Sequence, residues 1–350
     1  MTVSVKGIRT LKEEPVYVKA DGVPEGTRSA FDADGRYYPA QKHGDGVVII
    51  ADLERDAVKE LTLSDRQTGA ALSADISDRQ GYLRIRFDEK IFASYVFSSE
   101  LVKPYLGPVV SSHGESYTRL DLEAKEHPHH RSVFFGIGDV NGVDFWNEPA
   151  DRGSQKHINF SDIICGAAFV RFTAGNVWLD SAGTPLIDER RTFTVYNQSE
   201  NCRYIDTDII FKASYGDVKF GATKEAGPLG IRINDAMRAD TGNGRFVNSY
   251  GAENESECWG KSAHWCDYYG ELKGKKYGIA VFDTETNERY PTAWHIRNYG
   301  LFAANNLFFK GGYGISKNDT AEYKYRICFH EDGFNAADKF VQYATNPYKL

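Results

Sequence analysis

Tyr204-Ile-Asp-Thr-Asp-Ile-Ile-Phe211 is the stretch that decides the fold class, because polar and apolar side chains alternate along it. In an extended chain Ile205 and Ile209 fall on one face, and Asp206 and Asp208 fall on the other. This alternation is typical of an antiparallel strand with one face buried and one face in solvent. The stretch therefore predicts a protein built on β-sheets.

Other apolar runs of strand length lie on both sides of this stretch. They cover residues 47–50, 61–63, 83–87, 93–97, 108–110, 133–137, 163–172, 177–179, 191–196, 277–282 and 323–329. We expect 163–172 and 177–179 to form a hairpin that turns at Ala174-Gly175-Asn176. Near the C-terminus, Asn335 can cap a helix that Pro347 ends. Many strands and one terminal helix predict an all-β fold, a large antiparallel distorted β-sandwich.

The 350 residues are expected to form two units. Residues 1–78 hold short apolar runs punctuated by glycines, and we interpret them as a small N-terminal β unit with a structural role. Residues 79–350 hold the longer strand pattern and the segments rich in His, Arg and Trp. We interpret them as the β-sandwich domain that carries the function.

The composition argues against several classes of protein. The net charge of -7 disfavours a surface for nucleic acid or anionic membranes. No apolar run approaches the roughly 20 residues of a membrane-spanning helix, and residues 1–12 lack the apolar segment of a signal peptide. The 5 cysteines show neither zinc-site nor redox spacing, so we expect free thiols and a cytoplasmic protein. Assembly into a homo-oligomer stays open.

The densest group of functional side chains lies in residues 127–146, His-Pro-His-His-Arg-Ser-Val-Phe-Phe-Gly-Ile-Gly-Asp-Val-Asn-Gly-Val-Asp-Phe-Trp. The pattern predicts a polar loop, a buried strand and a second polar loop, and loops at strand ends often carry function. His129 and His130, followed by Arg131, suit acid–base chemistry, ligation of a divalent metal, or a hydrogen-bonded structural loop.

The second polar loop suits sugar binding. Asn141 and Asp144 can exchange hydrogen bonds with hydroxyl groups, and Trp146 offers a flat face on which a pyranose ring can stack. The alternative is a turn stabilised by its own side chains, since Asn141-Gly142 is a strong turn signal.

Later segments supply further candidates. Glu225, beside a Gly-Pro turn, is a candidate catalytic carboxylate with Arg232 as its partner, or it forms a surface ion pair. Lys261 lines a cleft or belongs to an aromatic core strand. Strand alternation places His295 and Arg297 on one face. Burying these two polar side chains costs free energy unless they have a partner or serve a function.

Several of these segments together resemble a bacterial family filed under the name "methane oxygenase PmoA". The matching segments are residues 127–132, 138–146, 260–265, 287–297 and 299–305. The resemblance spans about 104–350 and implies a soluble β-sandwich whose relatives often neighbour sugar-processing oxidoreductases and isomerases. Particulate methane oxygenase subunits are membrane proteins, whereas this sequence has no spanning segment. Asn306-Leu307 departs from the Asn-Pro common in the family, which leaves that loop's conformation open.

We therefore expect a mutarotase-like sandwich, by analogy of fold, that acts on a small sugar or oligosaccharide as a hydrolase, lyase or epimerase. The expected catalytic residues are His129, His130, Glu225 and His295, with a His as acid and Glu225 or a second His as base. The expected substrate-binding residues are Arg131, Asn141, Asp144, Trp146, His157, Arg232, Lys261, Arg297 and Asn305. The alternatives are a non-catalytic sugar-binding module and a metal-dependent oxygenase with its metal on the His cluster.

Overall fold

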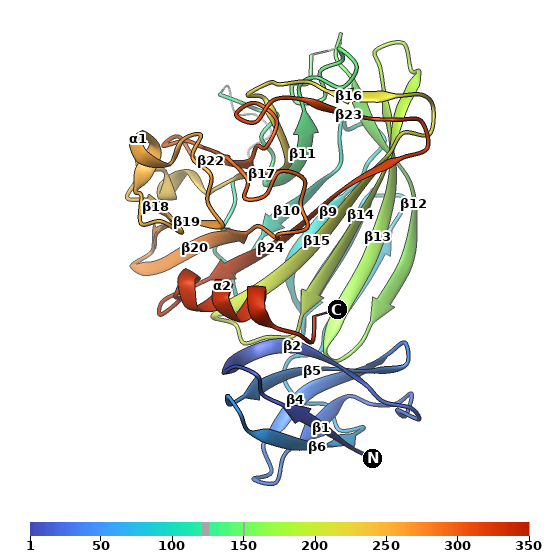
Figure 1. Ribbon diagram of the computed structural model, residues 1–350, viewed down its shortest axis with the longest axis vertical. Coiled ribbons are helices and arrows are strands. Elements are labelled where there is room, and N and C mark those ends of the chain that lie inside the picture. Colours follow the sequence, from blue (N-terminus) through green and yellow to red (C-terminus); the bar gives the residue numbers. More distant parts are fainter. Residues whose placement is uncertain (121–125, 150, 350) are drawn as a thin grey trace.

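The computed structural model describes residues 1–120, 126–149 and 151–349. These residues form antiparallel sheets with few helices, so the predicted all-β sandwich is confirmed (Figure 1). The N-terminal sheet has 6 strands in the order β1-β6-β3-β4-β5-β2. Its strands are β1 Thr2–Lys6, β2 Leu11–Lys19, β3 Ser29–Phe31, β4 Tyr37–His43, β5 Gly46–Leu53 and β6 Val58–Ser64.

Two 8-stranded sheets form the sandwich. The first has the order β21-β22-β17-β11-β10-β9-β8-β7. Its strands are β7 Leu72–Ser77, β8 Tyr82–Phe87, β9 Lys90–Val96, β10 Tyr105–Val109, β11 Val133–Ile137, β17 Ala226–Arg232, β21 Trp294–Ile296 and β22 Leu301–Ala304.

The second sandwich sheet has the order β12-β13-β14-β15-β24-β20-β19-β18. Its strands are β12 Ser154–Cys165, β13 Phe169–Leu179, β14 Pro185–Tyr196, β15 Cys202–Lys212, β18 Arg245–Asn248, β19 Trp265–Leu272, β20 Lys275–Phe282 and β24 Thr320–His330. The remaining elements are the ribbon of β16 Val218–Phe220 and β23 Tyr313–Ile315, a 3-10 helix Asp235–Met237, α1 Asn254–Cys258 and α2 Ala336–Thr345.

The main hydrophobic core lies between the two sandwich sheets. Ile205 and Ile209 on β15 point into it, as the alternation predicts. The opposite face of β15 is not open to solvent, because β5 and α2 help to cover it. Asp206 on that face accepts hydrogen bonds from Nε and Nη2 of Arg326, at 2.6 and 2.8 Å. Asp206 therefore belongs to a largely buried ion pair instead of a wet surface.

The N-terminal unit packs against the lower end of the sandwich, beside α2 (Figure 1). Val48 and Ile50 of β5 belong to one hydrophobic cluster with Phe169, Tyr196 and Tyr204 of the second sandwich sheet. Residues 72–77, expected in the N-terminal unit, form β7, which pairs with β8 of the sandwich. The change of sheet therefore falls between Ser64 and Leu72.

The hairpin expected to turn at Ala174-Gly175-Asn176 turns elsewhere, between the end of β12 at Cys165 and the start of β13 at Phe169. Gly175 lies inside β13, opposite Asn159 on β12. A Cβ at Gly175 would lie only 2.5 Å from Asn159 Oδ1. This glycine therefore permits a close approach between strands, which is the other role of a strand glycine.

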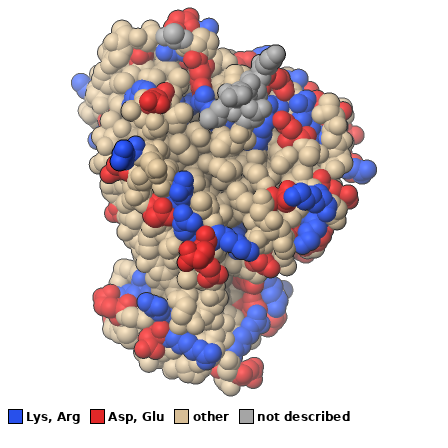
Figure 2. Space-filling view, turned by 180° about the vertical axis from the view of Figure 1, so that it is seen from behind, with Lys and Arg blue, Asp and Glu red and all other residues tan. Residues whose placement is uncertain are grey.

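The predicted C-terminal helix is confirmed as α2, and the Asn335 side chain caps it by accepting from the Asp338 amide. All 5 cysteines are free thiols. Among the described residues, no helix combines the length and apolarity needed to cross a membrane. On the face shown in Figure 2, acidic and basic residues are interspersed over both units.

Candidate functional site

The candidate site lies on the outer face of the first sandwich sheet, where strand alternation sorts the side chains. On β11, Val133 and Phe135 enter the main core, and Phe134 belongs to a separate cluster on the other face. On β21, Trp294 enters the core, which leaves His295 on the outer face. The Phe134 ring packs over Gly230 on β17, where a Cβ would clash because it would lie 2.7 Å from the ring.

A cavity of about 370 Å³ opens on this face, within the roughly 300–1,000 Å³ of small-molecule sites. Its lining residues are His127, His129, His130, Trp146, Asn147, Lys224, Glu225, His295, Arg297, Tyr299 and Leu301. The fold thus brings the expected catalytic residues His129, His130, Glu225 and His295 to one pocket, with Trp146 and Arg297 from the expected binding set. His295 and Arg297 line it together, as strand alternation predicts.

Parallel rings form a column beside the pocket. The Tyr299 and His127 rings stack with centroids 4.8 Å apart, and His127 stacks on His130 at 4.9 Å. His130 in turn stacks on Phe134 at 5.2 Å, and the edge of Trp146 lies against it at 5.3 Å. The His130 imidazole is therefore held on both faces and has little freedom to rotate.

His130 is 3% exposed, and neither Nδ1 nor Nε2 has a hydrogen-bond partner among the described residues. Burial, reinforced by the neighbouring His129 and His127, holds its pKa well below 6.5, so the ring is neutral near pH 7. A neutral imidazole carries one donor and one acceptor. Buried polar atoms without partners are rare and costly, which makes His130 a candidate to bind a ligand.

His295 has a defined tautomer. Its Nδ1 lies 2.7 Å from the Lys224 carbonyl oxygen, and because a carbonyl only accepts, Nδ1 carries the proton. Burial lowers the pKa of His295, so the ring is neutral and Nε2 carries a free lone pair. This Nε2 is buried without a partner among the described residues. It is therefore available to accept a proton from a bound molecule.

The third imidazole, His129, lies between the pocket and a buried cation. Burial lowers its pKa to about 3, with the positive charge of Lys103 as the next cause. Lys103 is 2% exposed, donates to the Trp146 carbonyl and has a pKa lowered by burial to about 8. It shares the Glu148 carboxylate with Arg131, at 3.5 and 2.6 Å. Arg131 pairs with Glu148 and does not line the pocket. The prediction that it binds substrate is therefore not supported by its position.

Asn305 holds the loop that carries Glu225 through hydrogen bonds to its backbone. Asn305 Nδ2 donates to the carbonyls of Thr223 and Lys224, at 3.2 and 2.9 Å. Glu225 accepts from Thr223 Oγ1 at 3.1 Å and lies 3.5 Å from Lys224 Nζ. Asn305 is fully buried and is a positioning residue instead of the predicted substrate contact.

Other expected binding residues also have structural partners. Asp144 accepts from the backbone amides of Trp146 and Asn147, so it shapes the loop and does not face the pocket. Asn141 bridges to β16, donating to the Asp217 carbonyl and accepting from the Lys219 amide. Trp146 does line the pocket but is 2% exposed, so it offers no open face for a pyranose ring.

His157, Arg232 and Lys261 lie outside the pocket. His157 packs in an aromatic cluster, with Phe160 at 4.3 Å between ring centroids. Arg232 is fully buried, with Nη2 3.3 Å from Glu126 Oε2. Lys261 is exposed, directly after a turn, and does not line the pocket. The residue types were suitable for a site, but depth and direction depend on packing between segments far apart in sequence.

The pocket also contains residues that were not predicted: His127, Asn147, Lys224, Tyr299 and Leu301. Each lies within a few residues of a predicted site residue, and this closeness in sequence is the feature from which they could have been predicted. Among the described residues, no group of three or more His, Cys, Asp or Glu side chains is arranged to hold a metal ion.

The sequence model of one protein family matches residues 82–344. The chain belongs to this family of unknown function, DUF6807. No curated protein matches the chain. The family's description does not refer to a methane oxygenase, so that resemblance stays a prediction.

Several solved structures align with this DUF6807 chain. The alpha-galactosidase AgaB of Geobacillus stearothermophilus aligns over 74% of this chain and 41% of its own, with 10% identity and a TM-score of 0.41. A galactose 1-epimerase of Lactobacillus acidophilus NCFM aligns over 75% and 99%, with 9% identity and a TM-score of 0.36. A GalM/aldose epimerase homologue of C. elegans aligns over 76% and 100%, with 10% identity and a TM-score of 0.33. The chain spans less than half of the galactosidase, and scores this low do not imply a shared activity.

Proposed function

We propose that this protein is an enzyme that transfers protons on a small carbohydrate bound in the pocket of His130, Glu225 and His295. The observation that carries the proposal is the His295 tautomer: Nδ1 is fixed by the Lys224 carbonyl, and the free lone pair of Nε2 is buried beside the cavity. An imidazole that is neutral and oriented by a carbonyl has its second nitrogen free to accept a proton, as a general base must.

His295 Nε2 would take a proton from a sugar hydroxyl, or from a carbon next to a carbonyl group. The resulting negative charge would lie near the cations Lys224 and Arg297, which line the same pocket. The protonated His295 can then return its proton to the substrate, with Glu225 as the second proton-transfer group. In the resting protein His295 is thus the base, a role for which the sequence offered Glu225 or a second histidine beside a histidine acid.

The chemistry of the lining favours a hydroxylated ligand over an apolar one. Imidazole, amide, ammonium and carboxylate groups surround the cavity, and together they supply donors and acceptors for several hydroxyl groups. The cavity volume of about 370 Å³ suits a small ligand. Isomerisation or epimerisation, elimination and hydrolysis all begin with proton transfer, and they differ in their products.

The test is solvent exchange. Aldoses, ketoses and oxidised sugars would be incubated with the protein in D2O, and deuterium incorporation and new products followed by NMR. We expect His295→Asn to abolish deuterium incorporation at carbon and product formation, because the Asn amide can still donate to the Lys224 carbonyl but cannot act as a base. His113→Asn is the matched control, since His113 is a surface histidine outside the pocket.

The outcomes separate the alternatives. A sugar that raises the melting temperature without exchange or product would indicate a binding module and overturn the enzyme proposal. Exchange that persists in His295→Asn would exclude His295 as the base. Stoichiometric copper or iron in protein purified without a histidine tag would favour the metal-dependent oxygenase.

A further inference from the structure

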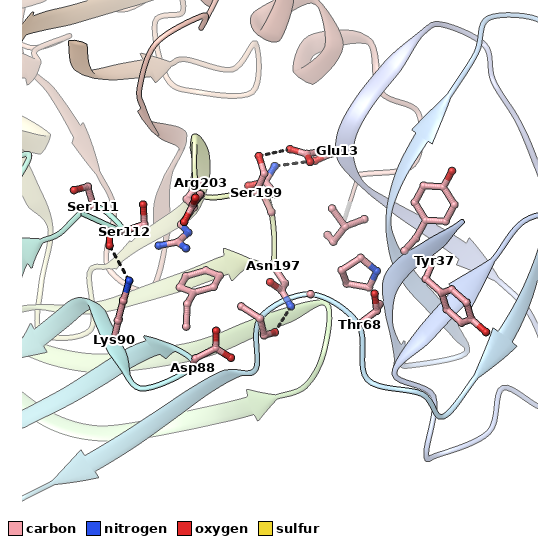
Figure 3. A pocket seen from close by; sticks show the side chains of 18 of the residues that line it. Glu13, Tyr37, Thr68, Asp88, Lys90, Ser111, Ser112, Asn197, Ser199 and Arg203 are labelled. Atoms are coloured by element: carbon pink, nitrogen blue, oxygen red, sulfur yellow. Dashed lines mark hydrogen bonds between the residues drawn. The ribbon is translucent and has the colours of Figure 1, made fainter. Parts of the chain in front are cut away.

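A second cavity, of about 510 Å³, lies between the N-terminal unit and the sandwich. Glu13 and Tyr37 line it from the N-terminal unit, and Lys90, Ser112 and Arg203 line it from the sandwich (Figure 3). Figure 3 shows the last three on the side of the cavity opposite Tyr37. This cavity shares no lining residue with the pocket of His295.

Arg203, on β15, is the unusual residue of this cavity. It is 9% exposed, and its guanidinium carbon lies 3.8 Å from the centroid of the Phe87 ring. Its Nε is buried without a hydrogen-bond partner, and among the described residues no carboxylate lies within ion-pair distance of the guanidinium. Stacking on a ring does not replace the hydrogen bonds that a buried guanidinium loses from water.

Other buried arginines of the sandwich do have carboxylate partners. Arg191 lies 2.6 Å from Glu189, and Arg326 lies 2.7 Å from Glu14 and 2.6 Å from Asp206. Burial lowers the pKa of Arg203, whereas more distant charges, Glu200 and Asp88 among them, raise it. Within the part of the chain that the structure describes, Arg203 is thus a buried cation without a direct carboxylate partner.

Ser112 supplies a second unpartnered group on the same cavity. Its Oγ is buried and has no hydrogen-bond partner among the described residues. The Lys90 ammonium lies beside it and donates to the Ser112 carbonyl at 3.0 Å. A guanidinium, a hydroxyl and an ammonium together form a set of donors suited to a carboxylate.

We propose that this cavity binds a small hydroxylated monocarboxylate, such as a sugar acid, whose carboxylate pairs with Arg203. A single negative charge matches Arg203, the guanidinium of this lining that has no carboxylate partner among the described residues. The cavity is also lined by Asp88, Glu89 and Glu200, which would repel a doubly charged phosphate. The same carboxylates can accept hydrogen bonds from the hydroxyl groups of the ligand. The inference does not depend on the reaction proposed for the other pocket.

The test compares D-glucuronate, D-glucose and inorganic phosphate as ligands of the full-length protein, by isothermal titration calorimetry. We expect glucuronate to bind and the other two to bind much more weakly. Arg203→Met should lower the affinity for glucuronate by about tenfold or more, because charge-assisted hydrogen bonds are lost. The variant should fold, since removing an unpaired buried charge leaves ligand-free stability unchanged or raises it.

One control sharpens the test. Arg84 also stacks on a ring, 3.7 Å from the Tyr82 centroid, but lies outside the cavity. Arg84→Met should therefore bind glucuronate like the wild type. The proposal is overturned if the wild type does not bind glucuronate, if phosphate binds as tightly, or if Arg203→Met binds glucuronate unchanged.

Discussion

Arg326 Nη1, on β24, donates to Glu14 Oε2, on β2, at 2.7 Å, and this ion pair ties the sandwich to the N-terminal unit. The Glu14 side chain is fully buried and that of Arg326 is 3% exposed. Arg326 also binds Asp206 through Nε and Nη2. The guanidinium is therefore shared between a carboxylate of its own sheet and one of the neighbouring unit.

We expect Glu14→Ala to lower the free energy of unfolding by about 1–3 kcal/mol, the value of a hydrogen bond to a buried charged group. Asp206 remains as a partner of Arg326, so the loss should stay below that of an ion pair broken completely. Urea denaturation would measure it. Glu25→Ala removes an exposed partner of Lys42 and should change stability by less than about 1 kcal/mol. Equal effects of the two substitutions would contradict the shared-interface interpretation.

The sequence allowed the fold class to be predicted because alternation depends only on local order. It did not reveal what covers each face: Asp206 and Asp208 suggested solvent, but the N-terminal unit and α2 lie over much of that face. Gly175 suggested a turn because glycine serves both turns and close strand contacts. Which role applies depends on Asn159, on the neighbouring strand.

Part of the site could also be predicted from the local order of residues. Alternation placed His295 and Arg297 together, and the density of imidazoles marked His129 and His130. Arg131 and Arg232 were as plausible by residue type, but their ion pairs with Glu148 and Glu126 lie outside the lining of the pocket, whereas Arg297, which pairs with Glu255, is part of it. Distinguishing a ligand-binding cation from a structural one requires knowledge of its partner, and Glu126 lies far from Arg232 in the sequence.

We expect acid to destabilise the protein through its buried histidines. The pKa of His130 in the folded state lies below its ordinary value of 6.5. Below that pH the unfolded chain takes up a proton that the folded protein does not, so stability is full above about pH 6.5 and falls as the pH decreases. At pH 5 this loss is about 2 kcal/mol for one such histidine.

His130→Phe isolates this contribution. Phenylalanine keeps an aromatic ring between His127 and Phe134 but cannot bind a proton. The stability difference between pH 7.5 and pH 5, measured by urea denaturation, should shrink by about 2 kcal/mol relative to the wild type. Comparing the two pH values removes any constant cost of the larger side chain. An unchanged difference would show that His130 titrates normally in the folded protein.

Asn305→Asp should disturb the loop of Lys224 and Glu225 without changing the volume of the side chain. The substitution replaces a donor with a carboxylate that faces the carbonyls of Thr223 and Lys224. We expect a loss of about 1–3 kcal/mol of stability and weaker sugar binding, measured by denaturation and calorimetry. Sugar affinity that equals that of the wild type would show that Asn305 does not position the pocket.

The last prediction concerns the positive charge behind the pocket. Lys103 is the first charged group, after burial, that lowers the pKa of His129, to about 3. Replacing Lys103 with Met removes that charge, while Arg131 still pairs with Glu148. The pKa of His129 should therefore rise, on the order of one unit, in an NMR titration. Lys156→Met is the control, because Lys156 is not among the charges that act on His129. If the two variants give the same His129 pKa, burial alone keeps this imidazole neutral and Lys103 has no electrostatic role in the pocket.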